Sequence, residues 1–259
     1  MQAARVAHES ESIGKAYMLA FSIWRKRSFP KKSRPSNEHD LLHNFLYTLA
    51  MVMPLNTVQH AALVIREGGV VLHPTDTCYG FTCDMKNEAA VRKLYDLKKM
   101  SLAKPSSVMV ANLDVARKFG DFSDLAFQLA ARFLPGPLTL LVPRLTSVPG
   151  FFNPGAEKIG IRIPGHSWTL DVLAMFPDTA LITTSANVSG QLEQYHVQGV
   201  LDQLGDARPD FMVDSGEIPR QKPSTIIEVV GEKGDRLKMI REGELAAVIR
   251  RDFSDFFLS

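Results

Sequence analysis

The segment GGVVLHPTDTCYGFTCD, residues 68–84, decides how the rest of the chain is interpreted. Its two glycines are typical of a helix end, and the apolar run VVLH at 70–73 is typical of a short buried strand. Pro74 alone would end that strand, yet two threonines that flank an aspartate follow it. We therefore expect the turn PTDT to hold small polar groups together, aimed at a ligand. The alternative is an ordinary capped turn whose hydroxyls bond only to the backbone.

Helix and strand patterns alternate from residue 56 to residue 241. Apolar residues recur at helical spacing in some segments and form short buried runs in others. This alternation indicates an α/β protein with one twisted, mixed central sheet and helices on its faces. We expect a single domain over 53–246, an extension over 1–52 and a tail over 247–259. Helices are expected at 56–67, 87–99, 112–120, 123–136, 167–176 and 196–204, and strands at 70–73, 106–110, 137–143, 158–164, 179–187, 211–214, 224–229 and 236–241.

The composition is that of a globular protein. Hydrophobic residues make up 45% of the 259 residues and charged residues 22%, so the chain can bury a sizeable core. Residues 1–52 carry eight lysines and arginines against four acidic residues, whereas residues 53–259 carry 22 against 24. The body of the chain is therefore not a basic nucleic-acid binder by composition, and strong RNA affinity would need a local patch.

Cysteine usage and hydropathy indicate a cytoplasmic protein that does not enter a membrane. Cys78 and Cys83 are too few for a disulfide scaffold and lack the partner pair of a zinc site. The apolar runs at 17–24 and 44–53 fall short of the roughly 20 residues of a membrane helix. Basic residues follow the first run, whereas a signal peptide has them before it. Met53 is an alternative start of the chain.

Polar residues recur where the expected strands begin or end, and ligands collect at strand ends in α/β sheets. The segment TTSANVSG at 183–190 follows one strand, and Thr139 lies inside another. Ser-Thr at 224–225 opens a third strand, and Arg241 ends a fourth. Each is by itself typical of a turn or a cap, so the prediction of a site depends on their meeting in the fold.

Three cations stand at informative positions. Lys98 lies seven residues after Val91 on one helical stripe, so its ammonium either snorkels to solvent or points into a pocket for an anion. Arg162, inside the apolar strand GIRIP, needs a carboxylate or phosphate, supplied by a ligand or by an internal salt bridge. Lys104, just before a strand, is the third candidate.

The familiar nucleotide-binding and hydrolase motifs are absent from the sequence. It contains no G-x-x-x-x-G-K-[ST], no G-x-G-x-x-G after a strand, no H-E-x-x-H and no G-x-S-x-G. The residues alone therefore indicate an α/β domain with a hydroxyl-rich, cation-flanked pocket. Such a pocket suits a small, polar, anionic ligand.

Taken together, HPTDTCYGFTCD, LPGPLTLLV, KIGIRIPGH, TTSANVSG, KPSTIIEV and IREGE resemble the YrdC/YciO family, from about residue 55 to residue 245 and in family order. The resemblance implies a single YrdC-like domain, a twisted α/β sheet with a concave, positively charged surface described as a double-stranded RNA-binding fold. The family includes synthases that join L-threonine, bicarbonate or CO2 and ATP into threonylcarbamoyl-AMP and release pyrophosphate. Mg2+ would be carried with the triphosphate, and the product would serve threonylcarbamoyladenosine modification of tRNA.

The resemblance also implies roles for particular residues. The threonine substrate would be held by Thr77, Thr139, Thr183 and Thr225. The nucleotide would be held by Lys98, Lys104, Ser185, Asn187 and Arg241. The catalytic residues among these would be Lys98, Lys104, Ser185 and Asn187, and no residue is expected to bind a resident metal.

One segment departs from the family pattern. The synthases carry K-x-R, usually within K-x-R-P-x-x-x-P, but KKMSLAKP here has Met100 and Ser101 in place of the arginine and the proline. A methionine cannot make the bidentate phosphate contact of an arginine. Either Lys104 reaches the same phosphates, or the chain is closer to the YciO-like branch, to which RQKPSTIIEV also points. The alternative function is an RNA-binding protein of the same fold with weak or no synthase activity.

Overall fold

The computed structural model describes residues 56–231 and 233–258. Within the chain, Thr57–Ser259 form one compact unit. The extension expected over 1–52 lies outside the described residues. No helix of the described part is long and apolar enough to cross a membrane.

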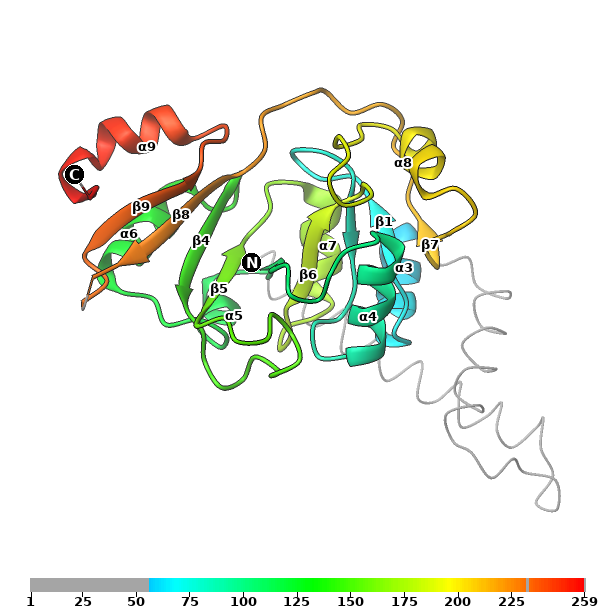
Figure 1. The fold of residues 1–259 in the computed structure, drawn as a ribbon, viewed down its shortest axis with the longest axis horizontal. Helices are drawn as coiled ribbons and strands as arrows, with labels where there is room; N and C mark the ends of the chain where they lie inside the picture. The colour runs from blue at the N-terminus through cyan, green and yellow to red at the C-terminus, as the bar shows by residue number, and fades with distance from the viewer. Residues whose placement is uncertain (1–55, 232, 259) are drawn as a thin grey trace, which may run out of the picture. The chain divides into compact units, whose positions relative to one another are not determined.

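One sheet of nine strands organises this unit (Figure 1). Its order is β7-β1-β2-β6-β3-β5-β4-β8-β9, with β1–β7, β3–β5 and β4–β8 parallel and the other pairs antiparallel. The mixed sheet that the sequence predicts is confirmed. The strands are β1 Val71–His73, β2 Gly80–Thr82, β3 Ser107–Met109, β4 Leu138–Pro143, β5 Lys158–Arg162, β6 Leu181–Ser185, β7 Phe211–Met212, β8 Thr225–Val230 and β9 Arg236–Arg241.

Short helices connect the strands, and three of them begin at caps visible in the sequence. The side chains of Asn87, Asn112 and Ser123 each accept a hydrogen bond from the backbone amide three residues later. The helices are α3 Thr57–Arg66, α4 Glu88–Leu97, α5 Leu113–Ala116, α6 Asp124–Phe133, α7 Ser167–Ala174, α8 Val197–Leu204 and α9 Ala246–Asp252, with a short 3-10 helix, η1 Ser254–Phe256.

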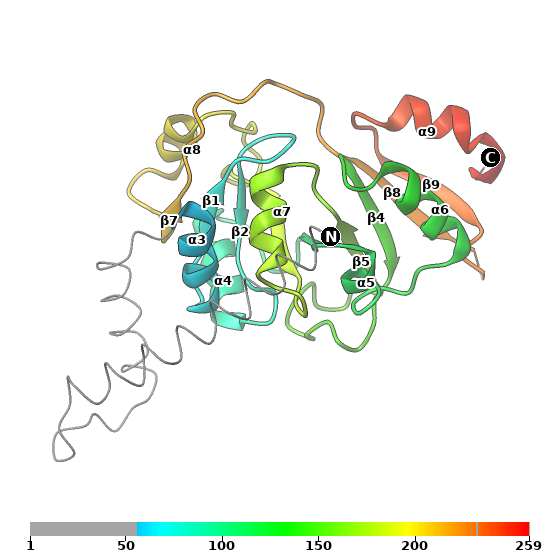
Figure 2. The same ribbon diagram turned by 180° about the vertical axis from the view of Figure 1, so that it is seen from behind.

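Apolar residues fix the helices against both faces of the sheet. Ile65 of α3 and Leu173 of α7 share a cluster with Val71, Met109 and Leu181 from three strands. A larger cluster joins apolar residues of α4, α6, α8 and α9 to every strand of the sheet except β7. α4 lies in front of the sheet in Figure 1, whereas α3 and α7 lie in front of it in the reverse view of Figure 2. Apolar burial therefore builds the frame that carries the polar side chains.

The structure differs from the sequence-based prediction at two elements. β2 was not predicted; it follows the PTDT turn and pairs with β1 and β6, so the turn connects adjacent antiparallel strands. Three residues are too few to show a strand period. Within the segment predicted as a tail, 247–259, the described residues contain most of α9 and the helix η1, and Ile249 and Phe253 belong to the core.

His73 ends β1 with a completely buried side chain. Its Nδ1 lies 2.9 Å from the carbonyl oxygen of Pro74, and its Nε2 has no hydrogen-bond partner among the described residues. Burial, assisted by the nearby charges of His166 and Arg162, lowers the pKa of the imidazole from 6.5 to about 4. The folded protein therefore keeps this ring neutral.

We expect the free energy of unfolding to fall as the pH is lowered from 6.5 to about 4, the two pKa values of His73 in the unfolded and folded chain. In this range the ring binds a proton in the unfolded chain but not in the folded one, so acid stabilises the unfolded state. The complete shift corresponds to roughly 3 kcal/mol.

Denaturant titrations across this pH range would measure the effect, compared between the wild type and His73→Asn. The difference in unfolding free energy between the two proteins should shrink as the pH falls. A difference that stays constant with pH would contradict the assignment.

Candidate active site

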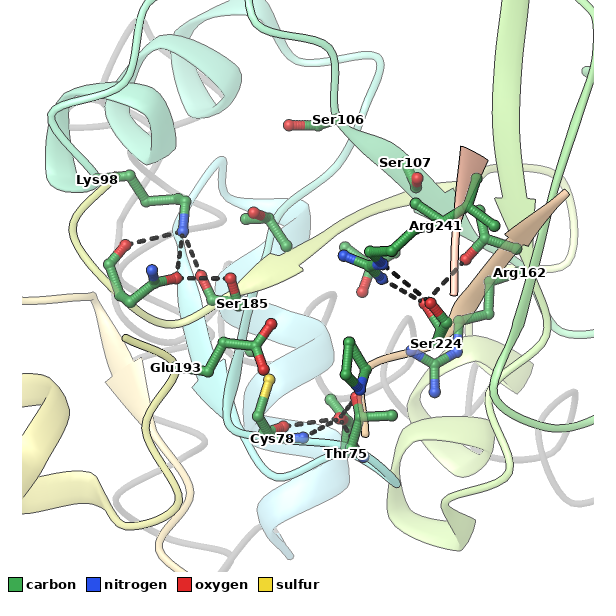
Figure 3. Close-up of a pocket in the computed structure, with 18 of the residues that line it drawn as sticks. Thr75, Cys78, Lys98, Ser106, Ser107, Arg162, Ser185, Glu193, Ser224 and Arg241 are labelled. Carbon is green, nitrogen blue, oxygen red and sulfur yellow. Dashed lines mark hydrogen bonds between the residues drawn. The ribbon is translucent and has the colours of Figure 1, made fainter. Parts of the chain in front are cut away.

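A cavity of about 280 Å³ is built from the strands and loops of the described unit. Ten serine and threonine residues line it, together with four cations. Figure 3 shows Lys98, Arg162 and Arg241 around it together with several of the hydroxyl-bearing residues, and they come from segments far apart in the sequence. The cations are Lys98, Lys104, Arg162 and Arg241.

The register of the sheet supplies the floor of the cavity. Thr139 of β4 pairs with Ile226 of β8, Ile226 pairs with Arg241 of β9, and all three line the cavity. Ser107 of β3 likewise pairs with Thr183 of β6, and both line it. Because directly paired residues project to the same face of a sheet, these rows present their side chains together.

A glycine keeps part of this floor open. Gly160 of β5 lies between Ser107 and Thr139, and a Cβ at this position would lie 2.5 Å from the Ser107 hydroxyl oxygen and 3.2 Å from the Thr139 methyl carbon. Any side chain there would displace two of the residues that line the cavity. The glycine of the KIGIRIP segment therefore belongs to the site although it carries no chemistry.

Lys98 is buried at the end of α4, with an exposed fraction of 2%. Its Nζ donates to the Asn187 carbonyl oxygen at 2.8 Å, to Asn187 Oδ1 at 3.2 Å and to the Ser185 carbonyl oxygen. Burial lowers the pKa of this ammonium from 10.5 to about 8. Lys98 therefore does not snorkel to solvent; it holds the SAN turn and leaves its charge at the cavity wall.

The SAN turn is also bonded within itself. Ser185 Oγ donates to Asn187 Oδ1 at 2.5 Å, and Asn187 Nδ2 donates to the carbonyl oxygen of Gln191 at 2.6 Å. The backbone amide of Ser189 donates back to the carbonyl oxygen of Lys98 at 2.8 Å. The S-x-N pattern thus forms a rigid turn whose remaining hydrogen-bonding capacity faces the cavity.

The PTDT turn forms another wall. Thr75 Oγ1 donates to the Cys78 carbonyl oxygen at 2.7 Å, and Thr77 Oγ1 lies 3.1 Å from Thr75 Oγ1. Asp76 accepts hydrogen bonds from Arg162 Nη2 and from the Gly165 amide. The aspartate therefore anchors the buried arginine of β5, which answers why an acidic residue stands between the two threonines.

Arg162 combines an internal salt bridge with a place in the cavity. The Asp76 partner offsets the burial of its charge, as one of the two sequence-based alternatives requires. Its Nε has no hydrogen-bond partner among the described residues, although the side chain is 6% exposed and lines the cavity. Arg162 thus combines an internal carboxylate partner with a buried Nε that no described residue satisfies.

Arg241 is fixed at the end of β9 by Ser224. Its Nε donates to the Ser224 carbonyl oxygen at 3.0 Å and its Nη2 to Ser224 Oγ at 2.8 Å. Ser224 Oγ also lies 3.3 Å from Thr139 Oγ1. Gly243 permits this approach, because a Cβ there would lie 2.1 Å from the carbonyl oxygen of Pro223.

Thr225 does not line the cavity, and its neighbour Ser224 does. Successive strand residues project to opposite faces, so Ser224 shares the face of Ile226. Thr225 is fully buried, and its Oγ1 accepts a hydrogen bond from the Leu245 amide at 2.9 Å. The sequence showed two adjacent hydroxyls at the start of a strand without showing which one faces inward.

Lys104 and Met100 both line the cavity. Lys104 Nζ donates to Ser189 Oγ at 3.1 Å, so this lysine contacts the loop after the SAN turn. Met100 packs partly against the core. The position where the synthases carry an arginine is thus apolar in this chain, while an ammonium from the same loop lies at the cavity wall.

The structure brings together all but one of the residues that the sequence analysis assigned to the site. Thr225 is the exception, and Arg162, Ser224 and Glu193 join the lining without an assignment in advance. The sequence signal for Arg162 was a cation inside an apolar strand. The signal for Ser224 was its position beside Thr225 at the start of a strand. Glu193 carried no sequence signal. The residues assigned in advance that line the cavity are Thr77, Lys98, Lys104, Thr139, Thr183, Ser185, Asn187 and Arg241.

Comparison with known proteins identifies the family. Residues 63–243 match the Sua5/YciO/YrdC family, whose description reads "Telomere recombination". This match spans more than half of the chain, and the chain belongs to that family. The resemblance carried by the sequence motifs is confirmed.

A relative and two solved structures are similar to this chain. A protein of Enterobacter sp. (strain 638) named threonylcarbamoyl-AMP synthase is 29% identical over 184 residues, which are 70% of this chain and 95% of that protein. Sua5 of P. abyssi in complex with L-threonine has a TM-score of 0.67 and 26% identity, covering 74% of this chain and 56% of that one. E. coli YciO has a TM-score of 0.64 and 21% identity, covering 73% and 90%. The likeness to YciO shows the fold.

We expect Lys98→Met to lower the free energy of unfolding by roughly 2 kcal/mol or more, because carbonyl oxygens of the SAN turn lose their buried donor. Lys99→Met is the matched control, since Lys99 is exposed and does not line the cavity. Denaturant titration at neutral pH measures both changes. Equal midpoints for the two variants would show that the ammonium does not stabilise the turn.

Proposed function

We propose that this protein is an L-threonylcarbamoyladenylate synthase, a nucleotidyltransferase that joins L-threonine, bicarbonate or CO2 and ATP into threonylcarbamoyl-AMP and pyrophosphate. The observation that carries the proposal is the cavity, in which ten serines and threonines stand beside four cations. Membership of the family supports the proposal, and so does the similarity to the Enterobacter protein named threonylcarbamoyl-AMP synthase. Hydroxyl groups are suited to recognise a small amino acid through hydrogen bonds, and fixed cations are suited to bind a triphosphate.

The reaction would use the residues for positioning and for charge stabilisation. The threonine amino group, once it has lost a proton, would form a carbamate, either by adding to CO2 with release of a further proton or by reacting with bicarbonate with release of water. A carbamate oxygen would then attack the α-phosphorus of ATP, the bond from that phosphorus to the bridging oxygen would break, and pyrophosphate would leave. Negative charge grows on the phosphate oxygens in this step, and preorganised cations such as Lys98 and Arg241 would stabilise it. Ser185 and Asn187, locked by Lys98, would orient the phosphates, while Thr77, Thr139 and Thr183 would hold the amino acid.

The lining residues fit a metal ion that arrives with the nucleotide. Glu193 is the only carboxylate among the lining residues, and the described part of the chain contains no group of three or more residues suited to hold a metal. Mg2+ commonly binds through substrate phosphates and a few protein oxygens. Bound in this way, it would neutralise phosphate charge beside the lysines.

Met100 favours a second candidate, an RNA-binding relative with little synthesis. Residues 53–259 carry slightly more acidic than basic groups, which gives no general affinity for nucleic acid. RNA binding by a local patch would weaken steeply with added salt. Transfer of the product to tRNA and a cytoplasmic location remain predictions from the sequence.

We expect release of pyrophosphate from ATP that requires L-threonine, bicarbonate and Mg2+ together. A coupled pyrophosphate assay measures it, with omission of each component in turn as the control. Folded protein that releases no pyrophosphate above the omission background would reject the proposal and leave the RNA-binding candidate.

We further expect Lys104 to supply the cation that Met100 lacks. Lys104→Gln should lower pyrophosphate release by about tenfold or more, because one charged contact of this kind contributes about 1.5–3 kcal/mol. Met100→Arg in the wild type should raise the rate only modestly, since a cation is already present at this wall.

The double variant separates this explanation from a general loss of function. Met100→Arg combined with Lys104→Gln should recover much of the activity that Lys104→Gln loses. No recovery, with both variants folded, would show that Lys104 does not stand in for the arginine. A large gain from Met100→Arg alone would identify Met100 as the defect.

A further inference from the structure

Glu193 is the carboxylate among the residues that line the cavity, and no sequence motif predicted that it would belong to the site. It lies in the loop that follows the SAN turn and lines the cavity opposite the cations of the sheet. Figure 3 shows its side chain directed into the cavity, near Cys78. Its charge is close enough to affect the pKa values of Cys78, Lys98 and Arg241, although burial is the largest influence on each.

The carboxylate of Glu193 has no partner within the described part of the chain. It makes no hydrogen bond and no ion pair there, although four cations line the same cavity. Arg162 is paired with Asp76, and Lys98 is bonded to the SAN turn. A carboxylate that is half-buried and unpaired loses hydration without compensation, unless a ligand supplies the positive group.

The backbone around Glu193 is held in place. The Leu192 carbonyl oxygen accepts from Gln203 Nε2 at 2.9 Å, and the Gln194 carbonyl oxygen accepts from the Tyr79 amide at 3.0 Å. The Tyr195 carbonyl oxygen accepts from the Ile218 amide at 2.9 Å. Both neighbours of Glu193 are therefore anchored to other elements, so the fold sets the position of its backbone.

The charges of the cavity are complementary to a zwitterion. Four cations line the cavity, of which Arg162 is paired with Asp76, and Glu193 is a carboxylate of the same lining that has no cationic partner among the described residues. Glu193 lies beside Cys78. Cys78 follows Thr77 in the sequence, and Thr77 is one of the lining residues proposed to hold the amino acid. We propose that Glu193 binds the ammonium group of the amino-acid substrate and thereby makes the cavity specific for an α-amino acid. This inference rests on the proposed function for the identity of the ligand.

A nucleotide-bound Mg2+ is the competing cation. Mg2+ usually gathers several oxygen ligands, and Glu193 is the single carboxylate that the cavity offers. An ammonium group needs one carboxylate and a few hydroxyl acceptors, and the lining of the cavity offers both. The two possibilities are distinguished by measuring whether a change of Glu193 weakens the binding of L-threonine or the binding of Mg-ATP.

The test compares Glu193→Gln with the matched control Glu217→Gln, whose exposed carboxylate does not line the cavity. Calorimetric titration of the full chain with L-threonine should show about tenfold weaker binding or more in Glu193→Gln, a change of about 1.4 kcal/mol or more. Binding of Mg-ATP should change by less than about twofold, and Glu217→Gln should match the wild type in both titrations.

3-Hydroxybutyrate provides the second arm, because it keeps the carboxylate and hydroxyl of threonine and lacks the ammonium group. It should bind the wild type and Glu193→Gln with similar affinity. Equal threonine affinity in the two proteins would overturn the inference, as would weakened Mg-ATP binding or no threonine binding by the wild type. Threonine binding that depends on Glu193 without pyrophosphate release would instead reject the proposed function and leave the inference standing.

Discussion

The contact between Lys98 and the SAN turn is the interaction on which the rest of the site depends. A single buried ammonium joins the end of α4 to the loop after β6, across 87 residues of sequence to Ser185 and 89 to Asn187. Burying that charge is costly, and three oxygen acceptors offset the cost. The same contact orients the turn and leaves a positive field at the cavity wall. Stability and ligand binding are thus coupled through one side chain.

The sheet explains why hydroxyls scattered along the chain become neighbours. Pairing of β3 with β6, of β4 with β8 and of β8 with β9 places Ser107, Thr183, Thr139 and Arg241 on one face. Gly160 keeps the space between two of them open. A polar floor of this kind is tolerated because the apolar clusters on and around the sheet supply the burial that holds the fold together.

The two carboxylates near the cavity, Asp76 and Glu193, differ in whether a cation of the protein neutralises them. Asp76 neutralises Arg162 inside the protein, whereas Glu193 faces the cavity without a partner among the described residues. Met100 stands where the synthases have a cation, and Lys104 is another cation of the lining. The lining therefore holds four cations beside one carboxylate.

The sequence by itself determined the order of most helices and strands, the mixed sheet and the family, because apolar periodicity and short motifs are local properties. It also marked Lys98 and Arg162, since a cation on an apolar stripe or strand stands out. Tertiary structure alone decided that Ser224 and not Thr225 faces the cavity, that Asp76 pairs with Arg162, and that Glu193 points inward. The physical reason is that strand register and loop anchoring set the direction of a side chain, and both depend on residues more than 80 positions away, such as the partners of Arg162 and of Ser224.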